Sequence, residues 1–255
     1  MRILVTFAVD AEFALWRRMR RFRRTRWATR PAYVTQIDGA EIGVVLTGVG
    51  PQRARQAAFE VMMAEPVDIC VSTGLAGALQ AEHLPSEIVA ARGVWSEEES
   101  RTIRSDELLL QWAGECGART VEKLCTADHL VLTAREKASL GVFADAVEME
   151  SFEVLKEARA WNVRAVAVRA ISDAAGEDLP LDFTGLVGAR GELRIFHLLK
   201  EIARHPVSWP ALVRFGRQSR RAAASLALFL DRYVAHLANR RAELHSEVAE
   251  EISCT

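Results

Sequence analysis

Residues 163–173, with the sequence VRAVAVRAISD, decide the fold of this chain. Their valines and isoleucine predict a buried strand that carries one internal arginine, Arg169, and ends at Asp173. A second short run, 144–149, also predicts a strand and leads into Glu150 through the sequence VEME. Both strands therefore end beside carboxylates, at the place where ligand-binding groups collect in α/β sheets. An acid without a function would be costly to bury there.

Strand-like apolar runs alternate with helix-like periodicity along the rest of the chain. We expect strands at about 2–9, 32–37, 40–47, 67–73, 87–95, 120–125, 144–149 and 163–172, and helices at about 11–25, 51–65, 106–116, 134–141, 150–161 and 191–204. This alternation predicts an α/β fold of three layers, α/β/α, in which helices cover both faces of a central mixed, mainly parallel sheet. We expect a catalytic domain over residues 1–190, with a loop at 174–190, and a C-terminal helical extension over residues 191–255.

The composition of the 255-residue chain is typical of a cytoplasmic enzyme. Half of the residues are hydrophobic and the formal net charge is -1, so the charge balance gives no reason to expect a nucleic-acid partner. Cys70, Cys116, Cys125 and Cys254 form no CxxC pair, which argues for a reducing compartment and against a zinc site or a disulfide framework. Met1 leads directly into a predicted strand without a signal peptide, and no apolar run approaches the roughly 18 residues of a membrane span.

Five motifs occur in an order that is similar to a known family. They are ILVTFAVDAE at 3–12, TGVG at 47–50, STGLAG at 72–77, VEME at 147–150 and RAISD at 169–173. Together they resemble the nucleoside phosphorylase and nucleosidase superfamily, and most of all its 5'-methylthioadenosine/S-adenosylhomocysteine nucleosidase branch. The resemblance extends over residues 1 to about 180 and implies the nucleoside phosphorylase-like fold.

The resemblance also implies a role for each site residue. Glu12 would activate the attacking water at the anomeric carbon, and Asp173 would protonate the purine as it leaves. Glu150 would accept hydrogen bonds from the 2' and 3' hydroxyls of the ribose. The expected catalytic residues are therefore Glu12 and Asp173. The expected substrate-binding residues are Gly77, Leu130, Val131, Met149, Glu150, Arg169 and Ser172.

The same acids also have simpler explanations. Glu12 suits the first turn of a helix, Glu150 suits a helix cap, and Asp173 suits an Asx turn that opens the following loop. Glu148 suits an ion pair with Arg169 at least as well as it suits a ligand contact. Because a buried arginine needs an anion, Arg169 is expected to contact Glu12, Glu148 or Glu150. A regular pleat would place Arg169 on the same face as Asp173.

Two departures from the family concern the nucleophile and the base. Phosphorolytic members carry an arginine and a serine for phosphate where this chain has STGL at 72–75, so both side chains are missing. Water is therefore the expected nucleophile, because phosphate requires charged donors. The phenylalanine with which nucleosidases stack on adenine is replaced within ADHLV at 127–131. This replacement places Leu130 against the base and leaves the backbone of Val131 for hydrogen bonds, while His129 is expected to be a surface or loop residue.

An arginine run and the C-terminal tail lie outside the motifs. The arginines stand at positions 17, 18, 20, 21, 23, 24, 26 and 30, and a solvated helix face explains them more simply than an anionic partner does. The tail leads into an amphipathic helix that ends at about Arg241 and packs on its own domain or on a partner subunit. The tail also resembles phosphorylase-like proteins associated with hopanoid biosynthesis, whose proposed substrate is an adenosyl group attached to a triterpene.

The sequence therefore predicts an enzyme that cleaves the N-glycosidic bond of a purine nucleoside or a 5'-modified adenosine by hydrolysis. The alternatives are a phosphate-dependent nucleoside phosphorylase, a hopanoid-associated enzyme for an adenosyl lipid, and a nucleoside-binding protein without turnover. The joint presence of Glu12, Glu150 and Asp173 argues against the last alternative, because a binder needs neither an acid nor a base. No metal and no cofactor are expected. The expected partners are a small-molecule nucleoside and a second copy of the chain in a homodimer, with lipid or membrane contact through the C-terminal helix as an alternative.

Overall fold

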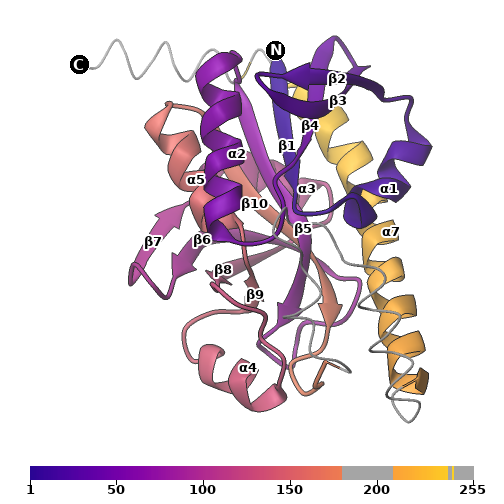
Figure 1. Ribbon diagram of the computed structural model, residues 1–255, viewed down its shortest axis with the longest axis vertical. Helices are drawn as coiled ribbons and strands as arrows, with labels where there is room; N and C mark the ends of the chain where they lie inside the picture. Colours follow the sequence, from indigo (N-terminus) through magenta and orange to yellow (C-terminus); the bar gives the residue numbers. More distant parts are fainter. Residues whose placement is uncertain (180–208, 241–242, 244–255) are drawn as a thin grey trace.

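Helices and strands alternate in the computed structural model, which describes residues 1–179, 209–240 and 243 (Figure 1). This part of the chain has an α/β fold in which helices flank a mixed sheet, as the sequence predicts. The helix expected at 191–204, the domain boundary expected at residue 190 and Cys254 lie outside the described residues. Cys70, Cys116 and Cys125 are free thiols.

Most elements lie within a few residues of their expected positions. The strands are β1 (Arg2–Phe7), β2 (Arg23–Trp27), β3 (Arg30–Ile37), β4 (Ala40–Leu46), β5 (Ile69–Ala78), β6 (Ile88–Ser96), β7 (Arg101–Arg104), β8 (Arg119–Thr126), β9 (Ala146–Glu148) and β10 (Arg164–Asp173). The helices are α1 (Asp10–Met19), α2 (Pro51–Ala64), α3 (Glu107–Glu115), α4 (Ala134–Leu140), α5 (Ser151–Ala160) and α7 (Trp209–Asn239).

Five strands of the sheet close into a ring. β5 pairs with both β10 and β9, β6 pairs with both β10 and β8, and β8 pairs with β9. The sheet continues from β5 through β1, β4 and β3 to the edge strand β2, and β7 pairs with β6. Because β1, β5 and β10 run parallel, their carboxyl ends lie on the same side of the sheet.

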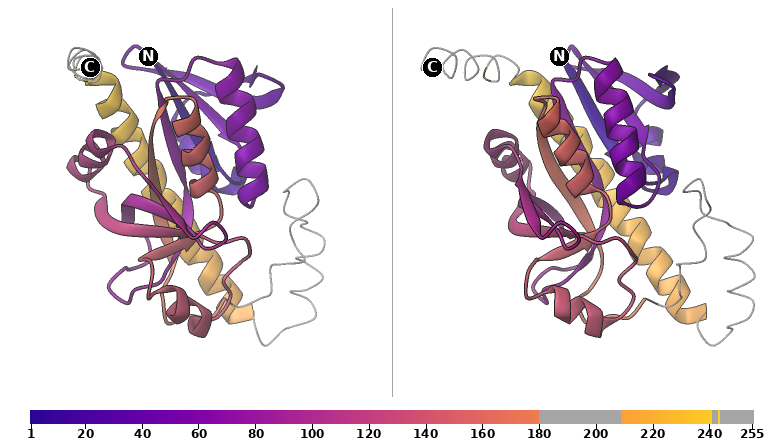
Figure 2. Two further views of the ribbon diagram at one scale, coloured as in Figure 1. Left: turned by 90° about the vertical axis from the view of Figure 1, so that its left-hand side faces the viewer. Right: turned by 60° about the vertical axis from the view of Figure 1, so that its left-hand side comes forward.

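Side chains of the central strands alternate between two apolar cores. In β1, Ile3, Val5 and Phe7 belong to the core under α1, α3 and α7, whereas Leu4 belongs to the core under α2 and α5. Figure 2 shows α2 and α5 on one face of the sheet and α7 on the other. A strand buried on both faces has little tolerance for charge. The buried Arg169 in the middle of β10 is therefore an exception that needs a partner.

The expectation of one helix over 11–25 was wrong, because part of the arginine run forms an edge strand. α1 ends at Met19, and Arg23–Trp27 forms β2, which pairs with β3. The aromatic ring of Trp27 explains the change, since it is buried over Gly43, where any Cβ would overlap it. The exposed arginines of β2 protect this edge from pairing with another chain.

Helix α7 is part of the core rather than an appendage. Its buried side chains include Leu226, Phe229, Leu230, Tyr233 and Leu237. Between them, Asp231 accepts hydrogen bonds from Nε of Arg20 at 2.5 Å and from the indole of Trp16 at 3.3 Å. The Tyr233 hydroxyl donates to the carbonyl of Leu109 at 2.7 Å. None of the helices in the described part of the chain has an apolar stretch long enough to cross a membrane.

Candidate active site

A cavity of about 230 Å³ opens at the carboxyl ends of β1, β5, β9 and β10. Its walls include Glu12, Gly77, Leu130, Val131, Met149, Glu150, Ser172 and Asp173. Every site residue predicted from the sequence therefore lines the cavity, except Arg169. Motifs that are far apart in the sequence meet here because strand ends of an α/β sheet converge on one side.

Glu12 lies in the first turn of α1 and its carboxylate accepts three backbone hydrogen bonds. Oε2 accepts from the amides of Ala8 and Val9 at 3.1 and 3.3 Å, and Oε1 accepts from the amide of Leu75 at 2.9 Å. Burial raises the pKa of Glu12, while these hydrogen bonds and the charge of Arg169 oppose the rise. A fixed carboxylate with a raised pKa is suited to take a proton from a nucleophile.

Two glycines of the STGLAG motif make room for the two predicted catalytic acids. A Cβ at Gly74 would lie 2.8 Å from Oε1 of Glu12, and the φ angle of this glycine is +150°. A Cβ at Gly77 would lie 2.9 Å from Oδ2 of Asp173. β5 thus carries no side chain at the two points where these carboxyl groups approach it.

A bulge in β10 turns Asp173 toward the cavity. The ladder between β10 and β5 shifts register between Ile171 and Asp173, so Ser172 is an extra residue in the strand. The expected regular pleat was therefore wrong at this point. Because the alternation is interrupted, Asp173 lines the cavity and Arg169 does not.

The carboxyl group of Asp173 is held on both oxygens. The Ser172 hydroxyl lies 2.5 Å from Oδ1 and 3.1 Å from the carbonyl oxygen of Ala76. On the other side, Nζ of Lys137 donates to Oδ2 at 2.5 Å. No hydrogen bond of an Asx turn holds the Asp173 side chain among the contacts of the described residues.

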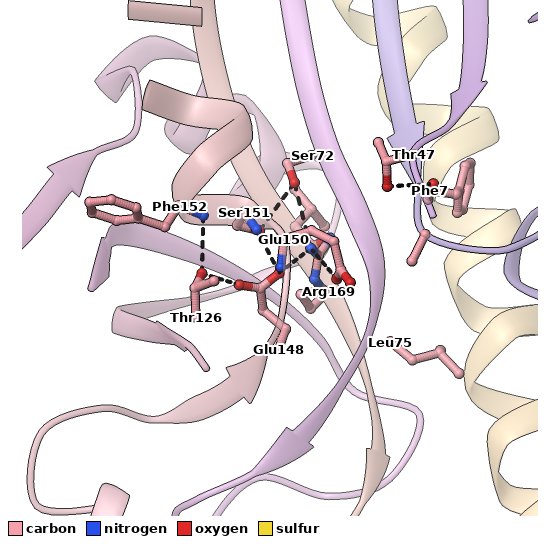
Figure 3. Close-up of polar contacts among 12 residues, drawn as sticks. Phe7, Thr47, Ser72, Leu75, Thr126, Glu148, Glu150, Ser151, Phe152 and Arg169 are labelled. Atoms are coloured by element: carbon pink, nitrogen blue, oxygen red, sulfur yellow. Dashed lines mark hydrogen bonds and ion pairs between the residues drawn. The ribbon is translucent and has the colours of Figure 1, made fainter. Parts of the chain in front are cut away.

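Arg169 lies buried behind the cavity wall in an ion pair with Glu148 (Figure 3). Its Nη2 donates to Oε2 of Glu148 and lies 3.9 Å from Oε2 of Glu150. The same oxygen of Glu148 accepts from the amides of Glu150 and Ser151 at 3.0 and 2.8 Å, at the start of α5. The ion pair expected for Glu148 is present, and Glu148 also lines the cavity. Arg169 fixes this acid in place without lining the cavity itself.

Glu150 is the cavity acid with the fewest compensating contacts. Its Oε1 accepts from the amide of Gly50 at 2.9 Å, and its side chain makes no helix-capping hydrogen bond. Burial, followed by the charge of Glu148, raises the pKa of Glu150 to about 8 against the opposing charge of Arg169. Near neutral pH this group therefore mostly retains its proton, whereas hydroxyl groups that donate to it favour the ionised form.

The loop before α4 forms the opposite wall, where Leu130 and Val131 line the cavity. His129 lies at the surface, as expected, with its ring nitrogens 2.6 Å from Asp128 and 2.7 Å from Glu136. In residues 1–179 and 209–240, no group of three or more His, Cys, Asp or Glu side chains is arranged to hold a metal ion.

An apolar groove of about 640 Å³ continues from the cavity between α1 and α7. Glu12, Leu75, Leu130 and Phe215 line both the cavity and the groove. The groove also contacts Leu15, Leu179 and Ala223, and the exposed Arg18 and Arg220 lie at its rim. In the described part of the chain, the cavity is therefore continuous with an apolar surface between α1 and α7.

Sequence reasoning missed two residues that shape the site, Lys137 and Phe215. Lys137 lies in the charged segment AREKASL, where its neighbours Arg135 and Glu136 reach the surface and give no sign that it is buried. Phe215 belongs to α7, far beyond the last motif, and reaches the site only because this helix packs across the sheet. Neither residue has a local sequence signal.

Comparisons with known proteins agree with this fold, although no protein-family model matches the chain. A 5'-methylthioadenosine/S-adenosylhomocysteine nucleosidase of Anoxybacillus flavithermus is 25% identical and covers 72% of this chain and 90% of its own. The crystal structure of the Campylobacter jejuni nucleosidase of the same name has a TM-score of 0.71 at 18% identity, covering 92% of this chain and 99% of that chain. A futalosine hydrolase mutant of Helicobacter pylori has a TM-score of 0.67 at 17% identity, covering 91% and 99%.

Glu150→Gln tests the raised pKa through stability. Because the folded pKa of about 8 exceeds the ordinary value of 4.5, the contribution of Glu150 is complete below about 4.5 and is lost as pH rises through about 8. Between about pH 5 and pH 9, we expect the unfolding free energy of the wild type to fall relative to that of the variant. The difference should reach at least about 1.4 kcal/mol, which corresponds to one pKa unit.

Urea unfolding of both proteins across this pH range measures the difference. Glu122→Gln is the matched control, because Glu122 lies on β8 with its side chain 79% exposed. Parallel pH curves for wild type and Glu150→Gln would contradict the raised pKa.

Proposed function

Because this chain is similar to 5'-methylthioadenosine/S-adenosylhomocysteine nucleosidases in sequence and fold, we propose that it belongs to the nucleoside phosphorylase and nucleosidase superfamily and hydrolyses the N-glycosidic bond of a purine nucleoside or a 5'-modified adenosine. One observation carries the proposal: Glu12, Glu150 and Asp173 come from three separate motifs and line one cavity. This reaction requires a base for the nucleophile, an acceptor for the sugar hydroxyls and an acid for the leaving purine. The homodimer and the cytoplasmic location expected from the sequence stay predictions.

Each acid has a role that its surroundings support. Glu12 takes a proton from water as the water oxygen bonds to C1' of the ribose. The electron pair of the C1'–N9 bond passes to the purine, and N7 of the purine takes a proton from Asp173. Glu150 accepts hydrogen bonds from the 2' and 3' hydroxyls, with Met149 beside the sugar.

The charges around the cavity favour water over phosphate as the nucleophile. The acidic side chains in its walls are those of Glu12, Glu148, Glu150 and Asp173. Among the described residues, the two buried cations, Arg169 and Lys137, are paired with Glu148 and Asp173. Ser72, at the position of the family's phosphate site, is buried with its hydroxyl 3.1 Å from that of Ser151. A phosphate dianion would therefore meet like charge and no available cation in the cavity walls.

The apolar groove supports a substrate with a large apolar 5' substituent. It begins at the cavity wall and runs between α1 and α7, so a group attached to the sugar can extend along it. A hopanoid-associated adenosyl lipid is the alternative substrate that this groove favours. The exposed Arg18 and Arg220 would then lie beside the distal end of the substituent.

The first prediction from the proposed function concerns the nucleophile. In phosphate-free buffer, the protein should release free purine and free ribosyl product from a purine nucleoside or a 5'-alkylthioadenosine. Added phosphate should change the rate by less than about two-fold, because the cavity acids repel it. Chromatography of base and sugar products measures both quantities. Strict dependence on phosphate, with a ribose 1-phosphate as product, would contradict hydrolysis.

The second prediction concerns the two catalytic acids. Asp173→Asn and Glu12→Gln should each lower the rate constant of the chemical step by about two to four powers of ten, since each removes a proton-transfer group. Single-turnover kinetics measure the loss. Asp10→Asn is the control, because Asp10 lies in the same turn of α1 as Glu12 but pairs with Arg17 outside the cavity. A variant with normal turnover and a lower melting temperature would show that the substituted acid, Asp173 or Glu12, has only a structural role.

The third prediction concerns the groove. Truncation of the tail is a poor test, because it removes the buried side chains of α7. Phe215→Ala should instead weaken binding of 5'-octylthioadenosine by at least about ten-fold relative to adenosine, given about 0.8 kcal/mol for each buried methylene. Calorimetry with the Asp173→Asn background measures both affinities. Leu228→Ala is the control on the exposed face of α7. Equal losses for both ligands would remove the groove from substrate recognition.

A further inference from the structure

Lys137 is a fully buried lysine whose side chain ends beside the predicted general acid. Its Nζ donates to Oδ2 of Asp173 at 2.5 Å, to the carbonyl of Ala174 at 2.9 Å and to the carbonyl of Glu177 at 2.8 Å. The side chain of Lys137 is 1% exposed and that of Asp173 is 7% exposed. This contact therefore lies inside the protein, at the wall of the cavity.

The three acceptors identify the charged form of Lys137. An ammonium group has three N–H donors, whereas a neutral amine has two, and here each of three oxygens lies within 2.9 Å of Nζ. One of the three acceptors is Oδ2 of Asp173, the group that becomes a carboxylate when it gives up its proton. A buried ammonium is tolerated only with this kind of complete pairing.

Lys137 also joins Asp173 to the segment that follows it. We call residues 174–179 the strap. The strap is tied to the loop before α4, where Leu179 donates to the carbonyl of Leu132 at 2.8 Å and Asp178 accepts from the amide of Ala134 at 2.7 Å. It is tied to α7 through Glu177, which accepts from the Gln218 side chain at 3.2 Å. Lys137 therefore lies where α4, the end of β10 and the strap meet.

We propose that Lys137 is a positioning residue for the leaving-group step: it fixes the orientation of the Asp173 carboxyl group and stabilises the carboxylate that remains after the proton has moved to the purine. The inference rests on the proposed hydrolysis. In that step the O–H bond of Asp173 breaks, the proton goes to N7, and the C1'–N9 electron pair goes to the base. Asp173 is then left as an anion 2.5 Å from an ammonium group.

Other charges around Asp173 do not replace this effect. Glu12, Glu148 and Glu150 line the same cavity and are negative or neutral, so they disfavour a further carboxylate. Arg169 is paired with Glu148, and the Glu177 side chain of the strap faces the amide of Ala174 and Gln218. Among the described residues, Lys137 is the cation in direct contact with Asp173.

Two consequences follow from an ammonium group at this place. Removing its charge withdraws stabilisation from the anion that forms as the proton leaves Asp173, so the basic limb of the pH–rate profile should move to higher pH. Removing the charge of Lys137 should also lower the rate only for substrates whose leaving group needs a proton. A p-nitrophenyl riboside, whose leaving group departs without protonation, should be nearly insensitive to the change.

The test uses Lys137→Gln, which keeps a hydrogen-bond donor without the charge, and Lys137→Arg, which keeps the charge. At the pH optimum, Lys137→Gln should lower kcat for a purine nucleoside by about ten-fold, a part of the effect of a general acid. The rate with p-nitrophenyl riboside should change by less than about two-fold. Lys137→Arg should restore at least part of the loss. Lys156→Gln, on α5 beside Glu99, is the control lysine.

A double-mutant cycle shows whether Lys137 acts through Asp173. In the Asp173→Asn background, Lys137→Gln should cause little further loss of kcat, because the carboxylate on which it acts is absent. This double variant also leaves no unpaired buried charge, so it is expected to fold at least as stably as Lys137→Gln alone. Equal loss with both substrates, an unmoved basic limb, or full additivity in the cycle would overturn the proposal.

A separate measurement distinguishes this proposal from the proposed function. If the wild type releases no purine with or without phosphate, the hydrolytic function fails. The pairing is then tested by carbon-13 NMR of aspartate-labelled protein, with Asp173→Asn to assign the signal. The pH dependence of the Asp173 carboxyl carbon signal should differ between Lys137→Gln and the wild type. Identical titrations would overturn the role of Lys137 whether or not the enzyme turns over.

Discussion

Four carboxyl groups face one cavity of about 230 Å³, and the structure around them offsets the cost of burying each one in a different way. Glu12 relies on three backbone amides. Glu148 relies on Arg169 and on the first amides of α5. Asp173 relies on Lys137. Glu150 has one amide and a repelling neighbour, so its pKa rises to about 8 and it keeps a proton. Without these hydrogen bonds, ion pairs and the retained proton, like-charge repulsion and desolvation would oppose folding around the cavity.

This arrangement also separates the acids by function. The acids with a full cationic partner, Glu148 and Asp173, are held in one orientation, whereas Glu150 remains able to change its protonation state when hydroxyl groups approach. Because Arg169 and Lys137 are both committed to ion pairs, neither is available to an incoming anion. The same ion pairs that allow the acids to be buried thus leave no free cation for phosphate in the described cavity walls. Neutral water does not need one.

The sequence was sufficient to predict most strands and the acids at their ends, because valine-rich apolar runs indicate buried strands and five motifs occur in the order of a known family. It was insufficient where tertiary contacts override local pattern. Trp27 draws Arg23–Trp27 into the sheet against the helical pattern before it. The bulge between Ile171 and Asp173 separates Arg169 from the cavity, although regular alternation would place them together. Lys137 is hidden in a segment that resembles a solvated helix, since only the fold places its ammonium group beside Asp173.

Helix α7 shows how one element can serve both folding and recognition. From Leu212 to Arg221 none of its side chains is buried, and this part lines the groove through Phe215 and Ser219. From Ala222 onward its inner face is buried in the core, where Asp231 and Tyr233 fix it to α1 and α3. The second part therefore supplies the free energy that holds the first part in place. Substitutions near Phe215 can consequently change the shape of the groove with little cost to the fold, whereas substitutions beyond Ala222 affect both.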